Sequence, residues 1–321
     1  MGDPAGIGPE ITLKALLDER IAEVCVPLVI GDILHLRRTA TELNILVELI
    51  SDISEIRTGG EIFVYDMHNV AKDLEYGDES AASGKASAEY IETAVELWRN
   101  GNINAIATAP ISKLAIAKAG YDFPGHTEFL AFLTESPKIA MSFFAEKLRV
   151  VLLSTHISLT DAIARVKTDA LVELIKFSDE QISKILGRKI RIAVAGLNPH
   201  ASEGGMFGGE EAKEIEPAIA FCKNEGIDVS GPFSPDTVFL RGFKGEFDAV
   251  IACYHDQATI AVKSLSFGSS VNVTLGLPLI RTSVDHGTAF DIAGKGIAES
   301  SSMSAAVRLA AELSVVNTTN S

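Results

Sequence analysis

The chain has 321 residues, of which 47% are hydrophobic and 22% are charged, and its formal net charge is -15. This composition is typical of a globular protein in water, and the length favours two domains over one. The excess of acidic residues argues against nucleic-acid binding, which requires a basic face. No apolar run approaches the ~20 residues of a membrane span, so no membrane partner is expected.

The cysteines and the N-terminus bear on the compartment. Cys25, Cys222 and Cys253 are widely spaced and odd in number, which fits a reducing compartment without disulfides and offers no cysteine pair for zinc. No signal peptide is evident, so we expect a cytoplasmic protein. The opening MGDPAGIGPE reads as a loop leaving a strand although no strand precedes it, which suggests that the natural chain begins earlier.

Strand and helix patterns alternate along the chain. A helix is expected from Pro9, a strand at 26–31, a helix at 32–43, a strand at 61–66 and an amphipathic helix ending near Asn100. Four further short apolar strands are predicted: AIATAP (105–110), VVLLSTH (150–156), IRIAVAGLNPH (190–200) and AVIACYH (249–255), with helices at 171–186 and 210–223. Such alternation predicts an α/β fold with mainly parallel sheets, whose ligands bind beyond the carboxyl ends of the strands.

Three of these four strands end at a histidine: His156, His200 and His255. The three imidazoles could therefore meet at one sheet edge and bind a metal with a position open for water or substrate. The alternative is that each histidine only hydrogen-bonds a neighbouring loop. Asp256, next to His255, could orient an imidazole, accept a substrate proton or cap the following helix.

Two groups of residues are suited to an anion. GHTE (125–128) places His126 and Thr127 at an expected helix start, where free amides suit a carboxylate or phosphate, although Thr127 could equally be a plain cap. Lys263, Asn272 and Arg281 each read as surface residues when taken alone. Together, in an acidic chain and among glycines, they indicate a phosphate clamp.

The chain has no GxGxxG after a predicted strand, so the usual Rossmann fingerprint is absent. DHGTAFDIAGKG (285–296) is a different kind of loop, with close glycines, a hydroxyl and carboxylates. It could hold an adenosine ribose through Asp291 and accept a close backbone approach at Gly287.

The chain carries, in this order, MGDPAGIGPEI, TAP with a lysine three residues on, GHTE, STH, NPHASEGGMFGGEE, PDT, YHDQ and VNVTLGLPLIRTSVDHGTAFDIAGKG. These motifs cover nearly the whole chain and resemble the 4-hydroxythreonine-4-phosphate dehydrogenase family of pyridoxal phosphate biosynthesis. The last block is also similar to the cofactor loop of isocitrate and isopropylmalate dehydrogenases, which bind NAD(P) without the Rossmann fingerprint.

The resemblance implies a homodimer of two-domain α/β subunits with the active site in the interdomain cleft. The first domain would comprise residues 1–108 with 277–321, on the cofactor side. The second would comprise 109–276, on the metal and dimer side. His156, His200 and His255 would bind one divalent metal (zinc, magnesium or cobalt), with His255 supplied across the dimer interface.

The same resemblance assigns the other groups. The substrate's phosphate and polar groups would be held by His126, Thr127, Lys263, Asn272 and Arg281. NAD or NADP would be bound by Asp285, His286, Gly287, Thr288 and Asp291. Asp236 and Asp256 match acidic residues near the substrate, and Asp256 or a metal-bound water would accept the proton.

The implied activity is oxidation, with decarboxylation, of a four-carbon 4-phosphorylated 3-hydroxy acid of the 4-phosphooxy-L-threonine type. Other segments, such as STHISL, GMFGGEE and PDTVFL, are more similar to a branch that oxidises D-threonate or D-erythronate 4-phosphate to dihydroxyacetone phosphate. A dihydrodiol-carboxylate dehydrogenase branch shares the fold, but its substrate lacks a phosphate. Rival classes are a metal-dependent hydrolase or lyase without NAD, and a non-catalytic phosphosugar-binding protein.

Overall fold

The computed structural model describes residues 1–52, 61–266 and 268–318; the remaining residues, including 319–321 of the first predicted domain, lie outside the described ones. The chain divides into two compact units. The first unit comprises Met1–Ile139 with Leu277–Ser314, and the second comprises Ala140–Gly276 with Val315–Ser321. The chain therefore passes from the first unit to the second after Ile139, whereas the sequence analysis places this boundary after residue 108. The chain re-enters the first unit at Leu277, the residue at which the sequence analysis places that boundary.

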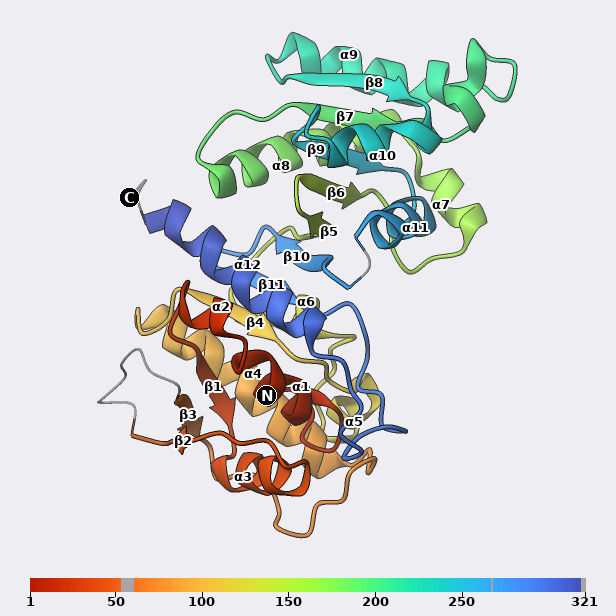
Figure 1. Ribbon diagram of the computed structural model, residues 1–321. Helices are drawn as coiled ribbons and strands as arrows, with labels where there is room; N and C mark the ends of the chain where they lie inside the picture. The colour runs from red at the N-terminus through yellow and green to blue at the C-terminus, as the bar shows by residue number, and fades with distance from the viewer. Residues whose placement is uncertain (53–60, 267, 319–321) are drawn as a thin grey trace. The chain divides into compact units, whose positions relative to one another are not determined.

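The first unit contains two groups of parallel strands (Figure 1). Strands β1 (Leu28–Gly31), β3 (Ile62–Asp66) and β2 (Leu49–Ile50) lie in the order β1–β3–β2. Strand β4 (Ala105–Thr108) pairs with β11 (Ile280–Ser283), from the other end of the chain. The helices are α1 (Gly8–Leu16), α2 (Glu19–Ala22), α3 (Ile33–Glu42), α4 (Ala81–Arg99), α5 (Lys113–Lys118), α6 (His126–Leu133) and α12 (Ser301–Thr318).

Local signals explain where these helices begin. The Asp32 side chain accepts a hydrogen bond from the amide of His35 and so caps α3. Ser80 and Ser83 bond each other's backbone amides at the start of α4, a reciprocal cap that satisfies two otherwise free donors. The strands predicted at 26–31, 61–66 and 105–110 and the helix predicted at 32–43 are confirmed, each one to two residues shorter at one or both ends.

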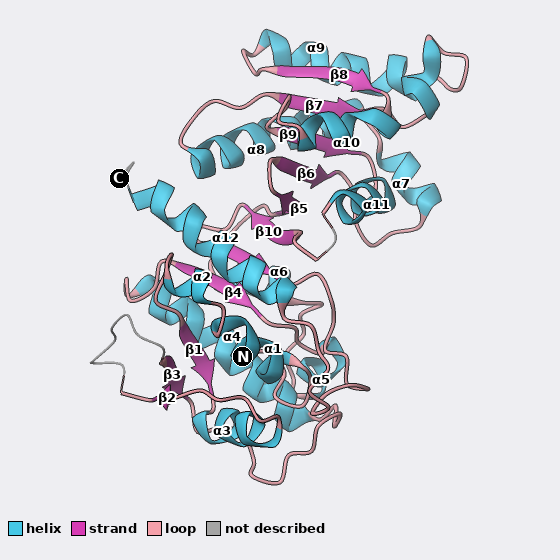
Figure 2. Cartoon of the chain, in the orientation of Figure 1, coloured by secondary structure: helices cyan, strands magenta, loops and turns pink. Residues whose placement is uncertain are grey.

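The second unit is built on one sheet, with strands in the order β10–β5–β6–β9–β7–β8 (Figure 2). The strands β6, β9, β7 and β8 are parallel to one another, whereas β5 is antiparallel to both β6 and β10. The strands are β5 (Ala140–Ala145), β6 (Leu148–Leu152), β7 (Ile192–Ala195), β8 (Val229–Phe233), β9 (Ala249–Ala252) and β10 (Val271–Leu275). The helices are α7 (Leu159–Arg165), α8 (Thr168–Leu186), the short turns η2 (Pro199–Glu203) and η3 (Glu211–Ile215), α9 (Glu216–Asn224), α10 (Pro235–Phe243) and α11 (His255–Leu265).

The parallel part of this sheet is buried on both faces. Val150 and Val250 pack in a core with residues of α10 and α11, such as Val238 and Val262. Val151 and Ile251, which alternate with them and so point to the other face, are also fully buried. Burial on both faces explains why these strands read as short continuous apolar runs rather than as alternating ones.

The α/β fold with mainly parallel sheets is confirmed. The antiparallel strands β5 and β10 are additions that the sequence patterns did not predict. The strands predicted to end at His156, His200 and His255 end earlier, at Leu152, Ala195 and Ala252, so the histidines lie in the segments that follow them. Within the described ranges, no helix is both long and apolar enough to cross a membrane.

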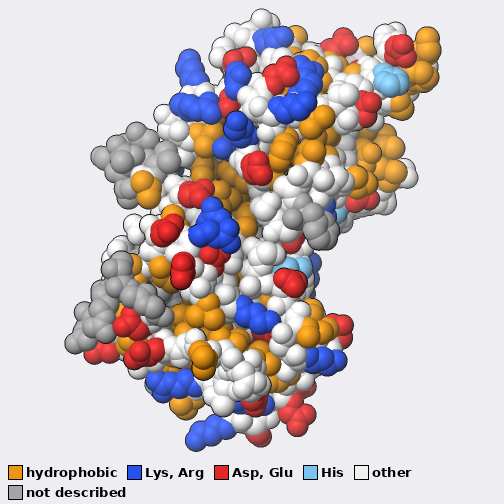
Figure 3. Space-filling model, viewed as in Figure 1, with side chains coloured by type: hydrophobic (Ala, Val, Ile, Leu, Met, Phe, Trp, Pro, Cys, Tyr) orange, Lys and Arg blue, Asp and Glu red, His pale blue; other side chains and the backbone are white. Residues whose placement is uncertain are grey.

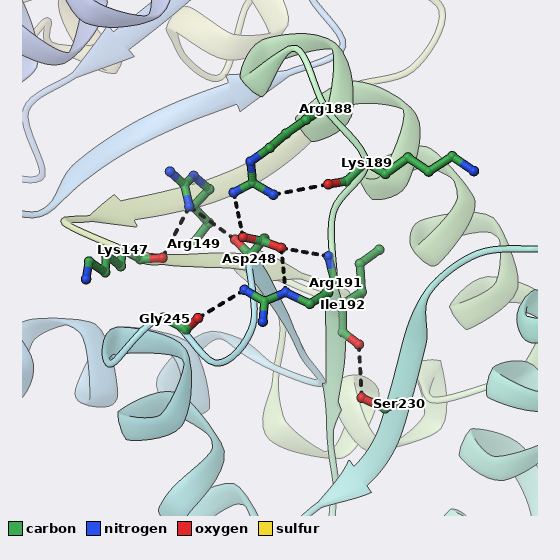
Figure 4. Close-up of polar contacts among 9 residues, drawn as sticks. All are labelled: Lys147, Arg149, Arg188, Lys189, Arg191, Ile192, Ser230, Gly245 and Asp248. Atoms are coloured by element: carbon green, nitrogen blue, oxygen red, sulfur yellow. Dashed lines mark hydrogen bonds and ion pairs between the residues drawn. The ribbon is translucent and has the colours of Figure 1, made fainter.

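Asp248 fixes the opposite, amino-terminal edge of the second unit's sheet (Figure 4). Its buried carboxylate accepts hydrogen bonds from Arg188 Nη2 (2.7 Å), the amide of Arg191 (2.8 Å) and Arg191 Nε (3.1 Å). Burial raises the pKa of this carboxyl, but the hydrogen bonds from the two arginines outweigh burial and hold the pKa well below its ordinary value. Although the chain is acidic overall, Lys and Arg side chains gather on the visible face of this unit (Figure 3).

Replacing Asp248 by alanine is expected to destabilise the protein by about 2 kcal/mol, because the hydrogen bonds of a buried charged acceptor are lost while the half-exposed arginines can turn to water. Because the pKa of Asp248 is lower in the folded chain than in the unfolded chain, its carboxylate stabilises the fold at every pH above the unfolded-state pKa of about 4. This stabilisation is lost as the pH falls below about 4 towards the folded-state pKa. Urea unfolding at neutral pH and at roughly pH 3 measures both effects. Glu246→Ala, which removes an exposed partner of Arg241, is the control and should leave the midpoint unchanged; an equally small change for Asp248→Ala would contradict the role of Asp248.

Candidate active site

The three histidines follow three adjacent parallel strands, in the order β6–β9–β7. His156 lies between β6 and α7, His200 lies in the turn η2 after β7, and His255 is the first residue of α11, directly after β9. Because the strands are parallel and adjacent, all three segments leave the same edge of the sheet (Figure 1). This is the edge where the sequence predicted a ligand site.

His156 and His255 are neighbours within one chain, with ring centroids 5.5 Å apart and planes inclined at 46°. A carboxylate oxygen of Asp256 lies 2.7 Å from Nδ1 of His255. A carboxylate can only accept here, so Nδ1 donates, and in the neutral imidazole Nε2 then keeps its lone pair for another partner. Helix α11 is not capped by Asp256: its N-cap is Tyr254, and Asp256 lies in the first turn. The contact with His255 fits the orienting role, and the role as a proton acceptor stays a prediction.

His200 lies in an unusual backbone segment. Its φ is +54°, and Ala201, Ser202 and Glu203 after it also have positive φ, a conformation that is costly for residues other than glycine. The imidazole lies beside the ring of Phe207, with centroids 6.2 Å apart. Among the residues that the structure describes, no three His, Cys, Asp or Glu side chains of a single chain converge as a metal site. One chain thus brings together two of the three predicted ligands, and the sharing of His255 across a homodimer stays a prediction.

Two side chains that the sequence reasoning missed hold the segments that carry these histidines. The buried Glu211 carboxylate accepts from the amides of Leu197 (2.9 Å) and Asn198 (2.7 Å) and so fixes the loop before His200. Gln257 accepts from the amide of Cys253 (2.7 Å) and donates to the carbonyl of Gly196 (2.8 Å), which joins the segments after β9 and β7. Both residues stand in motifs quoted above, GGEE and YHDQ, but a backbone-bonding role leaves no pattern of its own.

Asp236 lies at the same edge of the sheet. It is in the first turn of α10, which follows β8, the strand beside β7. Its exposed carboxylate accepts a hydrogen bond from Ser234. The structure therefore places Asp236 beyond the carboxyl end of a neighbouring strand.

In the first unit, His126 lies near enough to Arg281 for the charge of the guanidinium to act on the imidazole. Arg281, in β11, is almost fully buried and donates from Nη2 to Thr108 Oγ1 at 2.7 Å. Burial lowers its pKa to about 10, an effect opposed by Glu128, so the guanidinium stays charged at neutral pH. Burial lowers the pKa of His126 well below its ordinary value, and the positive charges of Arg281 and of the N-terminus lower it further. A neutral imidazole therefore accompanies a buried cation.

Helix α6 begins at His126 with Gly125 as its N-cap, and no side chain caps it. Thr127 is therefore not the plain cap that the sequence left open, and the first-turn amides lack a side-chain acceptor. Lys263, exposed on α11, and Asn272, in β10, belong to the second unit. The amide oxygen of Asn272 is buried with no hydrogen-bond partner in the described part of the chain. That all five residues act on one phosphate stays a prediction.

The predicted cofactor residues lie on one loop between β11 and α12. Asp285 accepts from Ser302 Oγ (3.2 Å), and the carbonyl of Thr288 accepts from the amide of Ile7 (2.9 Å). His286 and Asp291 are exposed, and His286 Nδ1 lies 3.1 Å from the carbonyl of Gly287. A methyl group added at Gly287 would meet nothing within 4 Å among the described residues, so the backbone there is open to a ligand.

Comparisons with known proteins identify the family. Residues 23–310 match the family described as "Pyridoxal phosphate biosynthetic protein PdxA". The chain is 45% identical to a D-threonate 4-phosphate dehydrogenase of Cupriavidus necator over 317 residues, which cover 98% of this chain and 95% of the relative. It is 44% identical to a 4-hydroxythreonine-4-phosphate dehydrogenase of Trichlorobacter lovleyi over 321 residues, covering 98% and 96%.

A solved structure supports the same assignment. The crystal structure of 4-hydroxythreonine-4-phosphate dehydrogenase from Klebsiella pneumoniae is similar with a TM-score of 0.91 and 41% identity, over 98% of this chain and 96% of that one. Family match, relatives and structure agree on an oxidoreductase, which excludes the hydrolase, lyase and non-catalytic readings. The chain therefore belongs to the PdxA family of pyridoxal phosphate biosynthetic proteins and is a dehydrogenase.

Proposed function

We propose that the chain catalyses the NAD(P)- and divalent-metal-dependent oxidation, with decarboxylation, of a four-carbon 4-phosphorylated 3-hydroxy acid. The observation that carries this proposal is the His156–His255 pair, with Asp256 bonded to His255, at the carboxyl edge of the second unit's sheet. Membership of a dehydrogenase family supports a nicotinamide cofactor.

The donor set fits a divalent cation. Two imidazoles with centroids 5.5 Å apart can share a metal, and the Asp256 hydrogen bond selects the tautomer of His255 that has a free Nε2. His200 would be the third ligand. Imidazoles accept zinc, cobalt and other divalent ions, so the proposal is for one divalent metal rather than for a particular one.

The cofactor and the substrate phosphate would use the first unit. The loop with Asp285, His286, Gly287, Thr288 and Asp291 has the open backbone, hydroxyl and carboxylate that a dinucleotide requires. Arg281, His126 and the uncapped start of α6 supply a cation, an imidazole and free amides for the phosphate. When bound, the dinucleotide would accept a hydride, and the cation would polarise the oxygens of the substrate.

The chain's own side chains would orient the substrate and manage its proton. Binding of the remote phosphate would be used to fix the reacting carbon in place. Asp256 holds the imidazole of His255 and its carboxylate is largely exposed, so Asp256 or a metal-bound water would accept the proton of the C3 hydroxyl. Asp236 is another exposed carboxylate at this edge.

The relatives divide between two substrates, one with an amine and one with a hydroxyl at C2. The proposed substrate is of the 4-phosphooxy-L-threonine type, and D-threonate or D-erythronate 4-phosphate is the alternative that the C. necator relative favours.

An assay panel tests the function. Each of the three 4-phosphates is offered with NAD or NADP and with zinc, magnesium, cobalt or a chelator, and nicotinamide absorbance is followed. We expect turnover of at least one phosphorylated acid, loss of turnover with chelator, and none with L-threonine, which lacks the phosphate. Turnover that is unaffected by metal removal, or no reduction of either dinucleotide by any member of the panel, would contradict the proposal.

A further inference from the structure

The N-terminal motif GDPAGIGPE has no role in the site described so far, yet it contacts the cofactor loop at two points. Both points lie within the first unit, where Ile7, Ile11 and Ala15 pack in one apolar core with residues of the 284–303 segment. The contacts are hydrogen bonds to the backbone of that segment rather than side-chain packing alone. They therefore fix where the loop's peptide groups lie.

The first contact is at the start of the loop. The amide of Ile7 donates to the carbonyl of Thr288 at 2.9 Å. Gly6 lies so close that a methyl group added there would stand 2.9 Å from the same carbonyl oxygen. The backbone at residue 288 is thus held directly against the N-terminal loop.

The second contact, at the end of the loop, is made by charged side chains of α1. Lys14 Nζ donates to the carbonyls of Gly296 (2.8 Å) and Ala298 (3.1 Å) and to Glu10 Oε1 (2.7 Å). The same Glu10 oxygen accepts from the amide of Ala298 at 2.9 Å. Glu10 is 2% exposed and Lys14 is 28% exposed, so water competes little for these bonds.

We propose that Lys14 and Glu10 are positioning residues for dinucleotide binding: they hold the carboxyl-terminal end of the 285–298 loop, so that the affinity for NAD(P) depends on helix α1. This inference rests on the proposed function, because it takes the loop to be the cofactor site. The pair is more than an ordinary helix salt bridge of the i,i+4 type. Its two members together bond three backbone groups of a distant segment.

The test replaces Lys14 by methionine, which keeps the apolar stem but removes all three donated bonds. We expect the Kd and the KM for the dinucleotide to rise about tenfold, as expected when charge-assisted hydrogen bonds that hold a binding loop are lost. kcat at saturating dinucleotide, the KM for the acid substrate and the bound metal should change little. Lys14→Arg should restore much of the affinity, because a guanidinium can still donate to Glu10 and a carbonyl.

Lys85→Met is the matched control, because Lys85 forms an exposed i,i+4 pair with Glu89 (3.7 Å) on α4 and should leave dinucleotide affinity unchanged. Hydrogen–deuterium exchange of peptides covering residues 288–298 is a second readout that needs no activity, and it should rise in Lys14→Met but not in Lys85→Met.

The outcomes are distinguishable. If the unaltered protein binds neither NAD nor NADP, the proposed function fails. If it binds the dinucleotide and Lys14→Met binds it equally well, with unchanged exchange at 288–298, the positioning role fails alone. A loss in kcat and metal content together with affinity would point to general damage and would also overturn the specific role.

Discussion

Replacing His255 by asparagine is expected to lower turnover by at least about 100-fold and to reduce bound divalent metal, since even partners that only orient a metal ligand cost 10–100-fold when removed. His255 lies beside His156 and is held by Asp256, so the substitution removes one of the two imidazoles that the chain brings together. Metal content after dialysis is measured alongside turnover, because the two should fall together. Unchanged metal content with full turnover would contradict the role of His255.

The control is the same substitution at an exposed histidine. His68 is 73% exposed, in the first unit, and pairs only weakly with Asp66 at 3.3 Å. Its positive φ of +49° is tolerated by asparagine. His68→Asn should therefore retain turnover, metal and stability.

The same variants test whether His255 is shared across a homodimer. Neither His156→Asn nor His255→Asn should be active alone. If the two residues act in one site from different subunits, mixed dimers of the two variants contain one intact site and regain activity. If both act from the same chain, as their 5.5 Å separation within one chain allows, every site in the mixture carries a defect and no activity returns.

Replacing Gly84 by alanine is expected to destabilise the protein by about 3 kcal/mol or more. In an isolated helix this change would stabilise by about 1 kcal/mol, because alanine has the higher helix propensity. Gly84 of α4, however, lies against the backbone of α5: an added methyl would stand 2.0 Å from the carbonyl oxygen of Ala115 and 2.6 Å from the amide nitrogen of Ile116. No side-chain rotation relieves a contact with backbone, so the two helices would have to separate.

Urea unfolding followed by circular dichroism measures this loss. Gly209→Ala is the matched control, because a methyl there meets nothing within 4 Å among the described residues and φ at this position is not positive. A midpoint for Gly84→Ala equal to or above that of the unaltered protein would show that α4 and α5 do not approach so closely.

Six parallel strands were predictable because each is a short apolar run bounded by turn residues: β1, β3, β4, β6, β7 and β9. The parallel strands β2, β8 and β11 were not predicted. The segments that follow β6, β7 and β9 are equally readable, so the sequence alone predicts that the three histidines lie at one edge of the sheet. The turn at Glu146 and Lys147 between β5 and β6 was missed. Two residues without glycine, proline or asparagine give little turn signal, and Glu146 adopts its positive φ only because the strands on both sides pair.

The site itself was less predictable than the sheet. Glu211 and Gln257 act on backbone groups of distant segments, so nothing in their neighbouring sequence marks them. Lys263, Asn272 and Arg281 lie close together in the sequence. The chain passes from the second unit to the first at Leu277, so Arg281 belongs to a different unit from the other two. Spacing along the sequence does not reveal this crossing, and its prediction at residue 277 depended on the family resemblance.

The return of the chain to the first unit at Leu277 has a consequence for synthesis on the ribosome. Strand β4 is made early, but its partner β11 emerges only after the whole of the second unit. Ile7 and Ile11 likewise become buried only after Val284 and Ala293 of the same core have been synthesised. The portion made later, residues 140–276, holds the strand pairs of the order β10–β5–β6–β9–β7–β8 within itself and can form them first, so the N-terminal portion waits longest for its partners and is exposed to chaperones for longer during translation.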